Sequence, residues 1–333
     1  MSLGPTLRLA FACLLALASA SAQAQIFRAY VASTGNDANP CTLQQPCRLL
    51  PAALTAVASG GEIWMLDSAN YNTGQVSITK SVTIRAIPGV LGSVVATGGS
   101  NGILVNVPGG RVTLRNLLIV HLTSSQYGIY LVSATQLNVA ECEVAGPLAG
   151  IYVSAANSSV TVKDTVLRGS NTGFYAISTV VATLDNVHAK DNTYGISAAD
   201  DARVTVSNSV LAGNDYGVRA YANSGNTRVV VESSAITGNS YGVYAQTAAS
   251  GGVAHLTVSR SDVSHSGNSG FYGLEAASAT TTLVSDNNLV THNLVGFKFD
   301  TTGPPTILSR GNNVLNYNGT DVQGGTLTAL AAQ

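Results

Sequence analysis

Tyrosines recur in this chain at a spacing that suits carbohydrate recognition. In the segment Gly150-Ile151-Tyr152-Val153, the tyrosine faces outward if its apolar neighbours face inward. Aromatic rings repeated on one surface stack on sugar rings, or on one another to stabilise a sheet. We predict sugar binding and name five ligand-binding residues. They are Tyr130, Tyr152, Tyr175, Arg219 and Tyr244, within an outward column that reads Tyr130, Tyr152, Tyr175, Ser197, Arg219, Tyr244, Glu275 and Lys298.

A second group of tyrosines precedes the glycines of the same repeats. Its spacing shares the inward phase, so we predict that it packs at a bend. Its members are Tyr127, Tyr194, Tyr216, Tyr241 and Tyr272.

An acidic and basic neighbourhood is the alternative site. Two carboxylates across a groove would hydrolyse a glycosidic bond, and a base beside an arginine or a metal would support elimination next to a uronate. Aspartate is also favoured at turns for backbone reasons, and this second interpretation is the stronger one. The neighbourhood comprises Asp164, Asp185, His188, Asp191, Asp200, Asp201, Arg203, Asp215 and Arg219.

The elements that position these residues are repeats of about 22 residues. A period of that length indicates a solenoid. Each repeat carries a glycine followed by an apolar residue. The glycines are Gly102, Gly128, Gly150, Gly173, Gly195, Gly217, Gly242, Gly273 and Gly296.

Each repeat contains short runs of alternating apolar and polar residues, rich in β-branched side chains and separated by Gly, Asn, Asp and Ser. Such strands pair with their copies above and below, and parallel connections are right-handed. The fold class is therefore all-β, a right-handed parallel β-helix of about ten rungs. A β-sandwich is the alternative, but it does not require an asparagine at the same place in each repeat. These asparagines are Asn171, Asn192, Asn214, Asn239, Asn268, Asn293 and Asn318, which we expect to be structural.

The cysteines indicate an oxidising compartment. Cys41 and Cys47 lie six residues apart in a loop with two prolines, which favours a disulfide. Cys142 aligns with Thr165, Ser209 and Ser234, a column of small residues at a turn, so we expect a buried thiol. We expect neither a metal nor another cofactor, because two cysteines alone rarely bind a metal.

The N-terminus resembles a secretory signal. Arg8 precedes a short apolar run, and small residues allow cleavage near Ala22 or Ala24. The run is too short to span a membrane. We therefore expect a secreted or periplasmic protein with no transmembrane span. After loss of Arg8 the chain has 15 basic and 17 acidic residues, which does not favour nucleic acid as a partner.

These features divide the chain into four parts. Residues 1–24 are the signal peptide and residues 25–61 form an N-terminal cap with the cysteine loop and a short helix. Residues 62–324 form the β-helix, and residues 325–333 are a C-terminal tail or cap. The helix is expected in the segment from Leu49, with Gly60 and Gly61 ending it.

Several segments resemble the opening of secreted right-handed parallel β-helix proteins of the pectin-lyase-like superfamily. They begin at Tyr30 (Tyr-Val-Ala-Ser-Thr-Gly-Asn-Asp), Pro46 (Pro-Cys-Arg-Leu-Leu-Pro-Ala-Ala-Leu), Gly61 (Gly-Glu-Ile-Trp-Met-Leu-Asp) and Ile78 (Ile-Thr-Lys-Ser-Val-Thr-Ile). The resemblance implies the fold over nearly the whole mature chain. It does not select a function, because the superfamily holds lyases, polygalacturonases, epimerases and tailspikes. The Asn-Thr-Asp, Gly-His-Gly and Asp-Pro-His-Asp motifs of its enzymes do not occur here.

Three functions stay open. The favoured one is an exported, non-catalytic module that binds a polysaccharide or another surface glycan. The second is a polysaccharide lyase or glycoside hydrolase with an unrecognised site, and the third is a structural or adhesive envelope protein.

Overall fold

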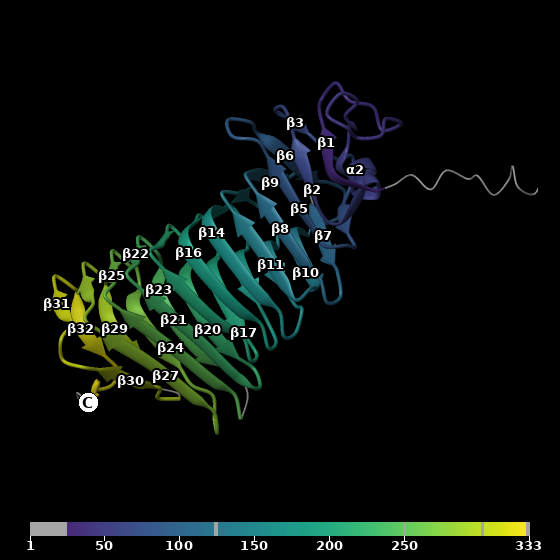
Figure 1. Cartoon of the computed structure of the whole chain (residues 1–333). Helices are drawn as coiled ribbons and strands as arrows, with labels where there is room; N and C mark the ends of the chain where they lie inside the picture. Colours follow the sequence, from purple (N-terminus) through teal and green to yellow (C-terminus); the bar gives the residue numbers. More distant parts are fainter. Residues whose placement is uncertain (1–24, 123–125, 249–250, 301–302, 331–333) are drawn as a thin grey trace, which may run out of the picture.

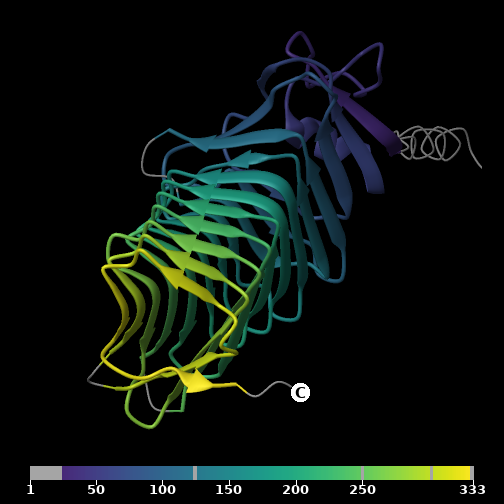
Figure 2. The ribbon, with the colours of Figure 1, turned by 90° about the vertical axis from the view of Figure 1, so that its left-hand side faces the viewer.

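The computed structural model describes residues 25–122, 126–248, 251–300 and 303–330. The predicted signal peptide lies outside these residues. Within them the chain winds into an elongated parallel β-solenoid of stacked rungs, which Figures 1 and 2 show from two sides. The fold class predicted from the 22-residue period is therefore confirmed.

The first side of the solenoid, face A, is an 11-stranded parallel sheet. Each of its inner strands pairs with the strand one rung above and one rung below. In chain order the strands are β4 (Val76–Ile78), β7 (Ile103–Asn106), β10 (Tyr127–Ser133), β13 (Ala149–Val153), β15 (Thr172–Ala176), β17 (Tyr194–Ala199), β20 (Tyr216–Ala222), β23 (Tyr241–Thr247), β26 (Ser269–Leu274), β29 (Val295–Phe299) and β32 (Thr320–Gln323).

The other two sides form one sheet that bends in each rung, and we call them face B and face C. Face B contains β1 (Ile26–Val31), β2 (Val57–Met65), β5 (Val82–Ala86), β8 (Arg111–Arg115), β11 (Gln136–Ala140), the first halves of β14 (Ser159–Arg168) and β16 (Val181–Lys190), then β18 (Arg203–Ser207), β21 (Asn226–Glu232), β24 (Val253–Ser259), β27 (Thr280–Asp286), β30 (Thr306–Ser309) and β33 (Thr328–Ala329). Face C contains β3 (Ala69–Asn70), β6 (Gly92–Ala96), β9 (Leu117–His121), β12 (Glu143–Val144), the second halves of β14 and β16, β19 (Val210–Ala212), β22 (Ala235–Thr237), β25 (Asp262–Ser264), β28 (Leu289–Thr291) and β31 (Val314–Asn316).

Left-handed backbone makes the bend between faces B and C. The backbone angle φ is between 49° and 55° at the five bend residues Asn116, Glu141, Asp164, Asn186 and Asn208. Asn and Asp adopt this conformation more readily than other side chains, which explains why they recur at the bend.

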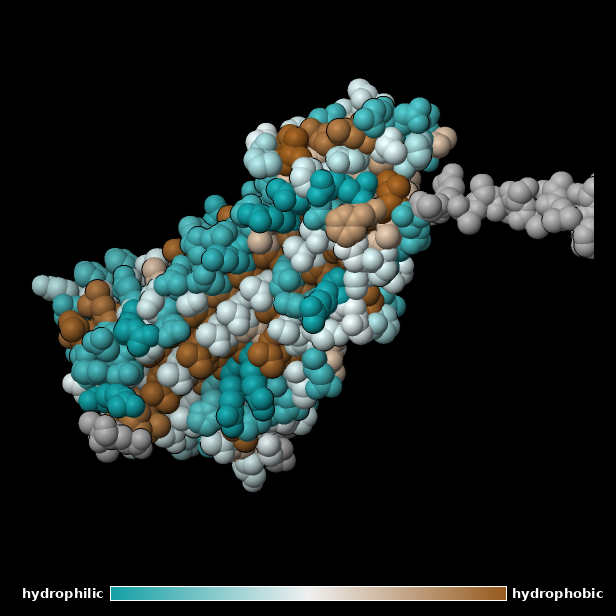
Figure 3. Space-filling view, viewed as in Figure 1, coloured by the Kyte–Doolittle hydropathy of each residue, from teal (hydrophilic) through white to brown (hydrophobic). Residues whose placement is uncertain are grey.

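The interior is a continuous aliphatic column. The inward positions of faces A and B, such as Ile151, Ile196, Val162 and Leu184, have no exposed surface. Figure 3 shows the outside of one face, where hydrophobic side chains form a narrow band, interrupted by polar ones, along the long axis. Alternation along each short strand divides core from surface in this way.

The N-terminal cap contains the expected helix. Helix α2 (Leu50–Ala56) buries Leu50, Ala53 and Leu54 against the first rungs. Its predicted end is wrong, because the helix stops at Ala56 and Gly60 and Gly61 lie inside β2. The backbone enters extended conformation at Val57, where the chain pairs with β1 and so competes with further helix.

The Cys41–Cys47 disulfide is present beside that helix, as the cysteine loop predicted. The backbone of the loop is tied to β1, because the Tyr30 amide donates to the Cys41 carbonyl at 2.8 Å and the Cys47 amide to the Tyr30 carbonyl at 3.0 Å. No helix in the described residues is long and apolar enough to cross a membrane.

The glycine column passes through face A, and its packing explains the residue type. A Cβ on Gly195 would lie 2.5 Å from the Gly217 carbonyl oxygen of the next rung. The same clash recurs from Gly102 to Gly296, so only glycine allows this approach of successive rungs. One predicted member is wrong: Gly270, not Gly273, occupies the column, since a Cβ on it would meet the Gly296 carbonyl oxygen at 2.9 Å.

Candidate functional site

The outer surface of face A carries a ladder of stacked tyrosines. Tyr130, Tyr152 and Tyr175 are register partners on successive strands, and their ring centroids are 5.0 and 5.4 Å apart. Tyr194, Tyr216 and Tyr241 form a second run with separations of 4.9 Å. These separations match the strand spacing of a β-sheet, so the sheet itself sets the stack.

The ladder combines both predicted columns, which corrects the sequence analysis. Tyr127, Tyr194, Tyr216 and Tyr241 are half-exposed, and all of them except Tyr194 touch rings of the other column. The alternation breaks at the glycine, since Gly128 and Ile129 are both buried while Tyr127 and Tyr130 both face outward. The glycine admits this break because its missing side chain leaves room for the next rung.

The register also corrects the C-terminal half of the outward column. Tyr244 pairs with Tyr272, and Tyr272 pairs with Lys298, so Glu275 does not belong to the column. The error follows from the choice of Gly273 for Gly270. The pair Gly270-Phe271 carries the same signal of a glycine before an apolar residue, displaced by three positions.

The rings stack on one another, which is the second of the two arrangements that the spacing allowed. Interplanar angles are only 7° for Tyr216 and Tyr241 and 8° for Tyr244 and Tyr272. Adjacent rings therefore cover one another's faces. The other ladder tyrosines are half-buried, and the predicted binding residue Tyr244 is buried, with only 7% of its surface exposed. The face offers a row of hydrogen-bonding hydroxyls on a stiff aromatic support.

Arg219 lies beside Tyr194, at the start of the second run of tyrosines. Its guanidinium carbon lies 4.8 Å from the centre of the Tyr194 ring and 4.3 Å from that of Tyr221. Its Nη2 donates to Gln246 Oε1 at 3.0 Å, while its buried Nε has no hydrogen-bond partner. Ser197, the register partner of Arg219, interrupts the row of tyrosines and is only 2% exposed. At this point of the row, cation–π contacts of Arg219 replace the stacking of one tyrosine on the next.

The C-terminal end of the ladder is polar. The Tyr272 hydroxyl donates to Asp300 Oδ2 at 2.8 Å, and Lys298 Nζ lies 5.2 Å from the centre of the Tyr272 ring. Lys298 also donates to Asn268 Oδ1 at 3.0 Å. Charged groups therefore adjoin the aromatic ladder at Arg219 and at Lys298.

Burial raises the pKa of several ladder tyrosines above the ordinary value near 10, at which a hydroxyl is already protonated at neutral pH. It raises the pKa of Tyr152 to about 12, and neighbouring tyrosines add to the shift. The pKa values of Tyr175 and Tyr244 are raised for the same first reason, burial, while Arg219 opposes the rise. The ladder consequently presents O–H donors at neutral pH.

The candidate acidic neighbourhood is distributed over separate corners of the rungs. Asp200 and Asp201 follow β17 and bind the next rung. Asp200 Oδ1 accepts from the Asn223 amide at 2.9 Å, and Asp201 Oδ1 accepts from the Asn226 amide at 2.8 Å. Both have positive φ, as expected of aspartates at turns.

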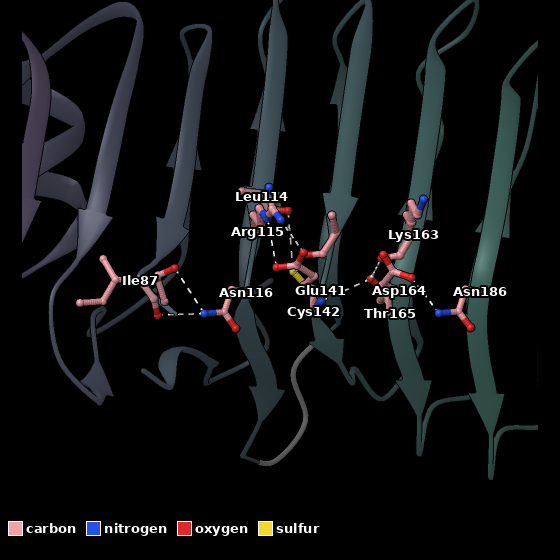
Figure 4. A network of polar contacts seen from close by, with 12 residues as sticks. Ile87, Leu114, Arg115, Asn116, Glu141, Cys142, Lys163, Asp164, Thr165 and Asn186 are labelled. Carbon is pink, nitrogen blue, oxygen red and sulfur yellow. Dashed lines mark hydrogen bonds and ion pairs between the residues drawn. The ribbon is translucent and has the colours of Figure 1, made fainter. Parts of the chain in front are cut away.

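The other acids of this neighbourhood serve the bend between faces B and C. Asp164 accepts a hydrogen bond from Asn186 Nδ2 at 2.7 Å, which Figure 4 shows beside the Arg115–Glu141 ion pair. Asp185 accepts from Asn208 and Ser207, and these hydrogen bonds lower the pKa of its carboxyl. The remaining members, His188, Asp191, Arg203 and Asp215, are exposed at other points of the rungs. In the described residues no three His, Cys, Asp or Glu side chains are grouped to hold a metal ion.

Cys142 is free and buried in the predicted column of small residues. Its amide donates to Thr165 Oγ1 at 3.3 Å, and Ser209 and Ser234 continue the same ladder. Burial raises the pKa of the thiol to about 12, so the unreactive protonated form dominates.

Comparison with known proteins agrees with this architecture. A family model described as "Right handed beta helix region" matches residues 70–230. This part of the parallel solenoid is a right-handed β-helix. No curated protein sequence matches the chain.

Solved β-helix structures share the fold at low sequence identity. Pectate lyase Pel9A is 17% identical with a TM-score of 0.60, covering 93% of this chain and 79% of its own. The A-module of mannuronan C-5 epimerase AlgE4 from Azotobacter vinelandii is 14% identical with a TM-score of 0.58, covering 82% of this chain and 91% of its own. XylC, solved in complex with xylose, is 8% identical with a TM-score of 0.56, covering 85% and 70%. These similarities support the pectin-lyase-like fold predicted from the sequence.

Proposed function

We propose that this protein is an exported, non-catalytic glycan-binding β-helix whose binding surface is the tyrosine ladder of face A. The observation that carries the proposal is the ladder itself, a row of stacked tyrosines held at strand spacing, all of which except the buried Tyr244 keep part of their surface exposed. Structural neighbours with the same fold act on polysaccharides, as their names state, and this supports the ligand class.

The ladder suits a polymer because it repeats. Successive rungs offer hydroxyl donors about 4.8 Å apart, so a chain along the axis meets similar groups at several points. The rings are already fixed by stacking, and binding therefore costs little side-chain entropy. Arg219 and Lys298 add charged donors beside the hydroxyls.

The turns supply a second argument for a binding function. Asp200 and Asp201 accept backbone hydrogen bonds from the following rung. We interpret them as structural residues, and this interpretation favours binding over hydrolysis or elimination.

The test replaces Tyr152 and Tyr175 by phenylalanine. Tyr152 touches three other rings, so alanine there would disturb the stack, whereas phenylalanine preserves it and removes only the hydroxyls. Loss of one hydrogen bond costs about 0.5–1.5 kcal/mol, so the double variant should bind a recognised glycan about five- to a hundredfold more weakly. A panel of acidic and neutral polysaccharides, with binding measured by calorimetry, provides the ligand.

Tyr317→Phe is the matched control, because Tyr317 is 78% exposed and lies away from face A. Unchanged affinity in the Tyr152→Phe, Tyr175→Phe variant would remove the ladder from the binding model. Absence of binding to every glycan would favour the structural or adhesive alternative. Release of sugar products by the wild-type protein, abolished by Asp200→Asn with Asp201→Asn, would establish the lyase or hydrolase alternative.

A further inference from the structure

A glutamine, Gln25, lies directly in front of the first strand of the solenoid, β1. Gln25 is exposed, whereas the next residue, Ile26, is half-buried and pairs with Val57 of β2. The chain is therefore held in the sheet from Ile26 onward, and Gln25 lies on the surface of the N-terminal cap.

The predicted signal peptide ends at this point of the chain. Its two expected cleavage points, after Ala22 and after Ala24, each leave a glutamine as the new first residue, Gln23 or Gln25. Cleavage after Ala24 follows the small-x-small segment Ala22-Gln23-Ala24 and leaves no tail in front of the residue that precedes β1. Export by this route therefore gives a glutamine with a free α-amine.

A glutamine at a free N-terminus closes a five-membered lactam ring. The lone pair of the α-amine attacks the carbon of the side-chain amide, so that a new C–N bond forms. The bond from that carbon to the amide nitrogen breaks, and ammonia leaves with the proton that the amine gives up. Nucleophile and electrophile belong to one residue, so the reaction is intramolecular and needs no oxidant, reductant or other reactant.

The surroundings of Gln25 leave its side chain free for this reaction. Within the described residues, no hydrogen bond or ion pair engages the Gln25 side chain. The residue borders two hollows of the cap, one against Pro40 of the cysteine loop and Ala56 of α2, the other against Lys80. The side-chain amide is therefore accessible, and no contact of the fold has to break before the ring closes.

The two charged groups that line these hollows already have partners. Lys80 Nζ donates to the first carbonyl of β2 at 2.9 Å. Asp37 Oδ1 accepts from the amides of Arg48 and Leu49, both at 2.8 Å, just before α2. Neither group depends on a charged α-amine at Gln25, so the cap keeps these contacts when the terminus becomes neutral.

We propose that the exported protein begins at Gln25 and that this residue is converted to pyroglutamate. The ring nitrogen is an amide, so the modification removes the positive charge of the terminus. It also protects the chain from exopeptidases that require a free α-amine. The strand protected is β1, whose Tyr30 holds the cysteine loop by backbone hydrogen bonds. The inference rests on the predicted signal peptide, goes beyond the glycan function and uses none of the tyrosines of the ladder.

The experiment expresses the full chain in an exporting host and isolates the protein from outside the cytoplasm. Free amines of the intact protein are methylated at once, so that a ring formed later during handling is not counted. Trypsin then cuts after Arg28 and releases the terminal peptide Gln25-Ile26-Phe27-Arg28 for mass spectrometry. No other Lys or Arg of the sequence is followed by glutamine, so digestion creates no second N-terminal glutamine. We expect the peptide to be unmethylated and lighter than its unmodified form by one molecule of ammonia.

Gln25→Glu is the test variant, because a carboxyl group closes the ring far less readily than an amide does. Its terminal peptide should carry the methyl label and keep its full mass. Gln75→Glu is the matched control, since Gln75 borders the second hollow but has no free α-amine, and its terminus should stay blocked. A methylated, uncyclised Gln25 in the wild-type protein would overturn the inference. A chain that begins at any other residue, a cyclised Gln23 included, would overturn it as well.

Discussion

At the scale of single residues, stacked amides hold the rungs together. Asn214 Oδ1 accepts from the amide and the Nδ2 of Asn192, at 3.1 and 3.0 Å. Asn214 in turn donates to Asn239 Oδ1 and to the Ala189 carbonyl. The spacing of the asparagines predicts a structural role for them. Two members of the predicted column are wrong, because Ser170 and Ser266 occupy the positions in the asparagine ladder that we assigned to Asn171 and Asn268.

We predict that Asn214→Ala lowers the free energy of unfolding by about 2–3 kcal/mol. The change leaves the buried Asn192 amide without its acceptor, and an unsatisfied buried group costs about 1–3 kcal/mol. Urea unfolding followed by far-UV circular dichroism measures the loss. The matched change Asn223→Ala, at an exposed position, should cost less than about 0.5 kcal/mol. Equal losses of unfolding free energy in the two variants would show that the asparagine ladder stabilises the protein no more than an exposed asparagine does.

At the scale of elements, the N-terminal cap closes the open end of the solenoid. Helix α2 places Leu50, Ala53 and Leu54 over the first rungs, and the disulfide holds the adjoining loop to β1. A solenoid requires such a cover because its terminal rung would otherwise expose the aliphatic core.

We predict that Cys41→Ser with Cys47→Ser lowers the stability of the cap by about 2 kcal/mol, the value expected for a loop of this length. The effect is a lower thermal midpoint, measured by differential scanning calorimetry. Cys142→Ser should have little effect, since Ser209 and Ser234 occupy the same column in later rungs. A larger loss from Cys142→Ser than from the disulfide variant would contradict this assignment.

At the scale of the whole molecule, the two ends of the solenoid differ. The first rungs are covered by α2, whereas the strands of the last rung, β31, β32 and β33, have no buried residue. Rungs contact mainly their neighbours, so stability in a solenoid is local and a terminal rung with few buried contacts opens first.

Hydrogen exchange tests this asymmetry. We predict that amides in β31 to β33 exchange at least a hundredfold faster than those in β16 to β21, because opening the last rung breaks one interface and exposes little buried surface. Exchange followed by mass spectrometry locates the difference. Equal protection at the C-terminal end and in the middle would show that the solenoid opens as one cooperative unit.

The sequence by itself determined the repeat, the strand-rich rung, the disulfide and the structural role of the asparagines. These features are local or strictly periodic, and each recurs wherever the same backbone conformation recurs. The column of Cys142, Thr165, Ser209 and Ser234 was visible for the same reason, since every rung makes the same turn.

Only the tertiary structure decided which side chains meet across rungs. A glycine before an apolar residue occurs twice after Gly242, at Gly270 and at Gly273, and only the register of Tyr244 with Tyr272 shows that Gly270 belongs to the column and Tyr272 to the ladder. The two tyrosine columns merge because a glycine breaks the alternation, which no strand period reveals.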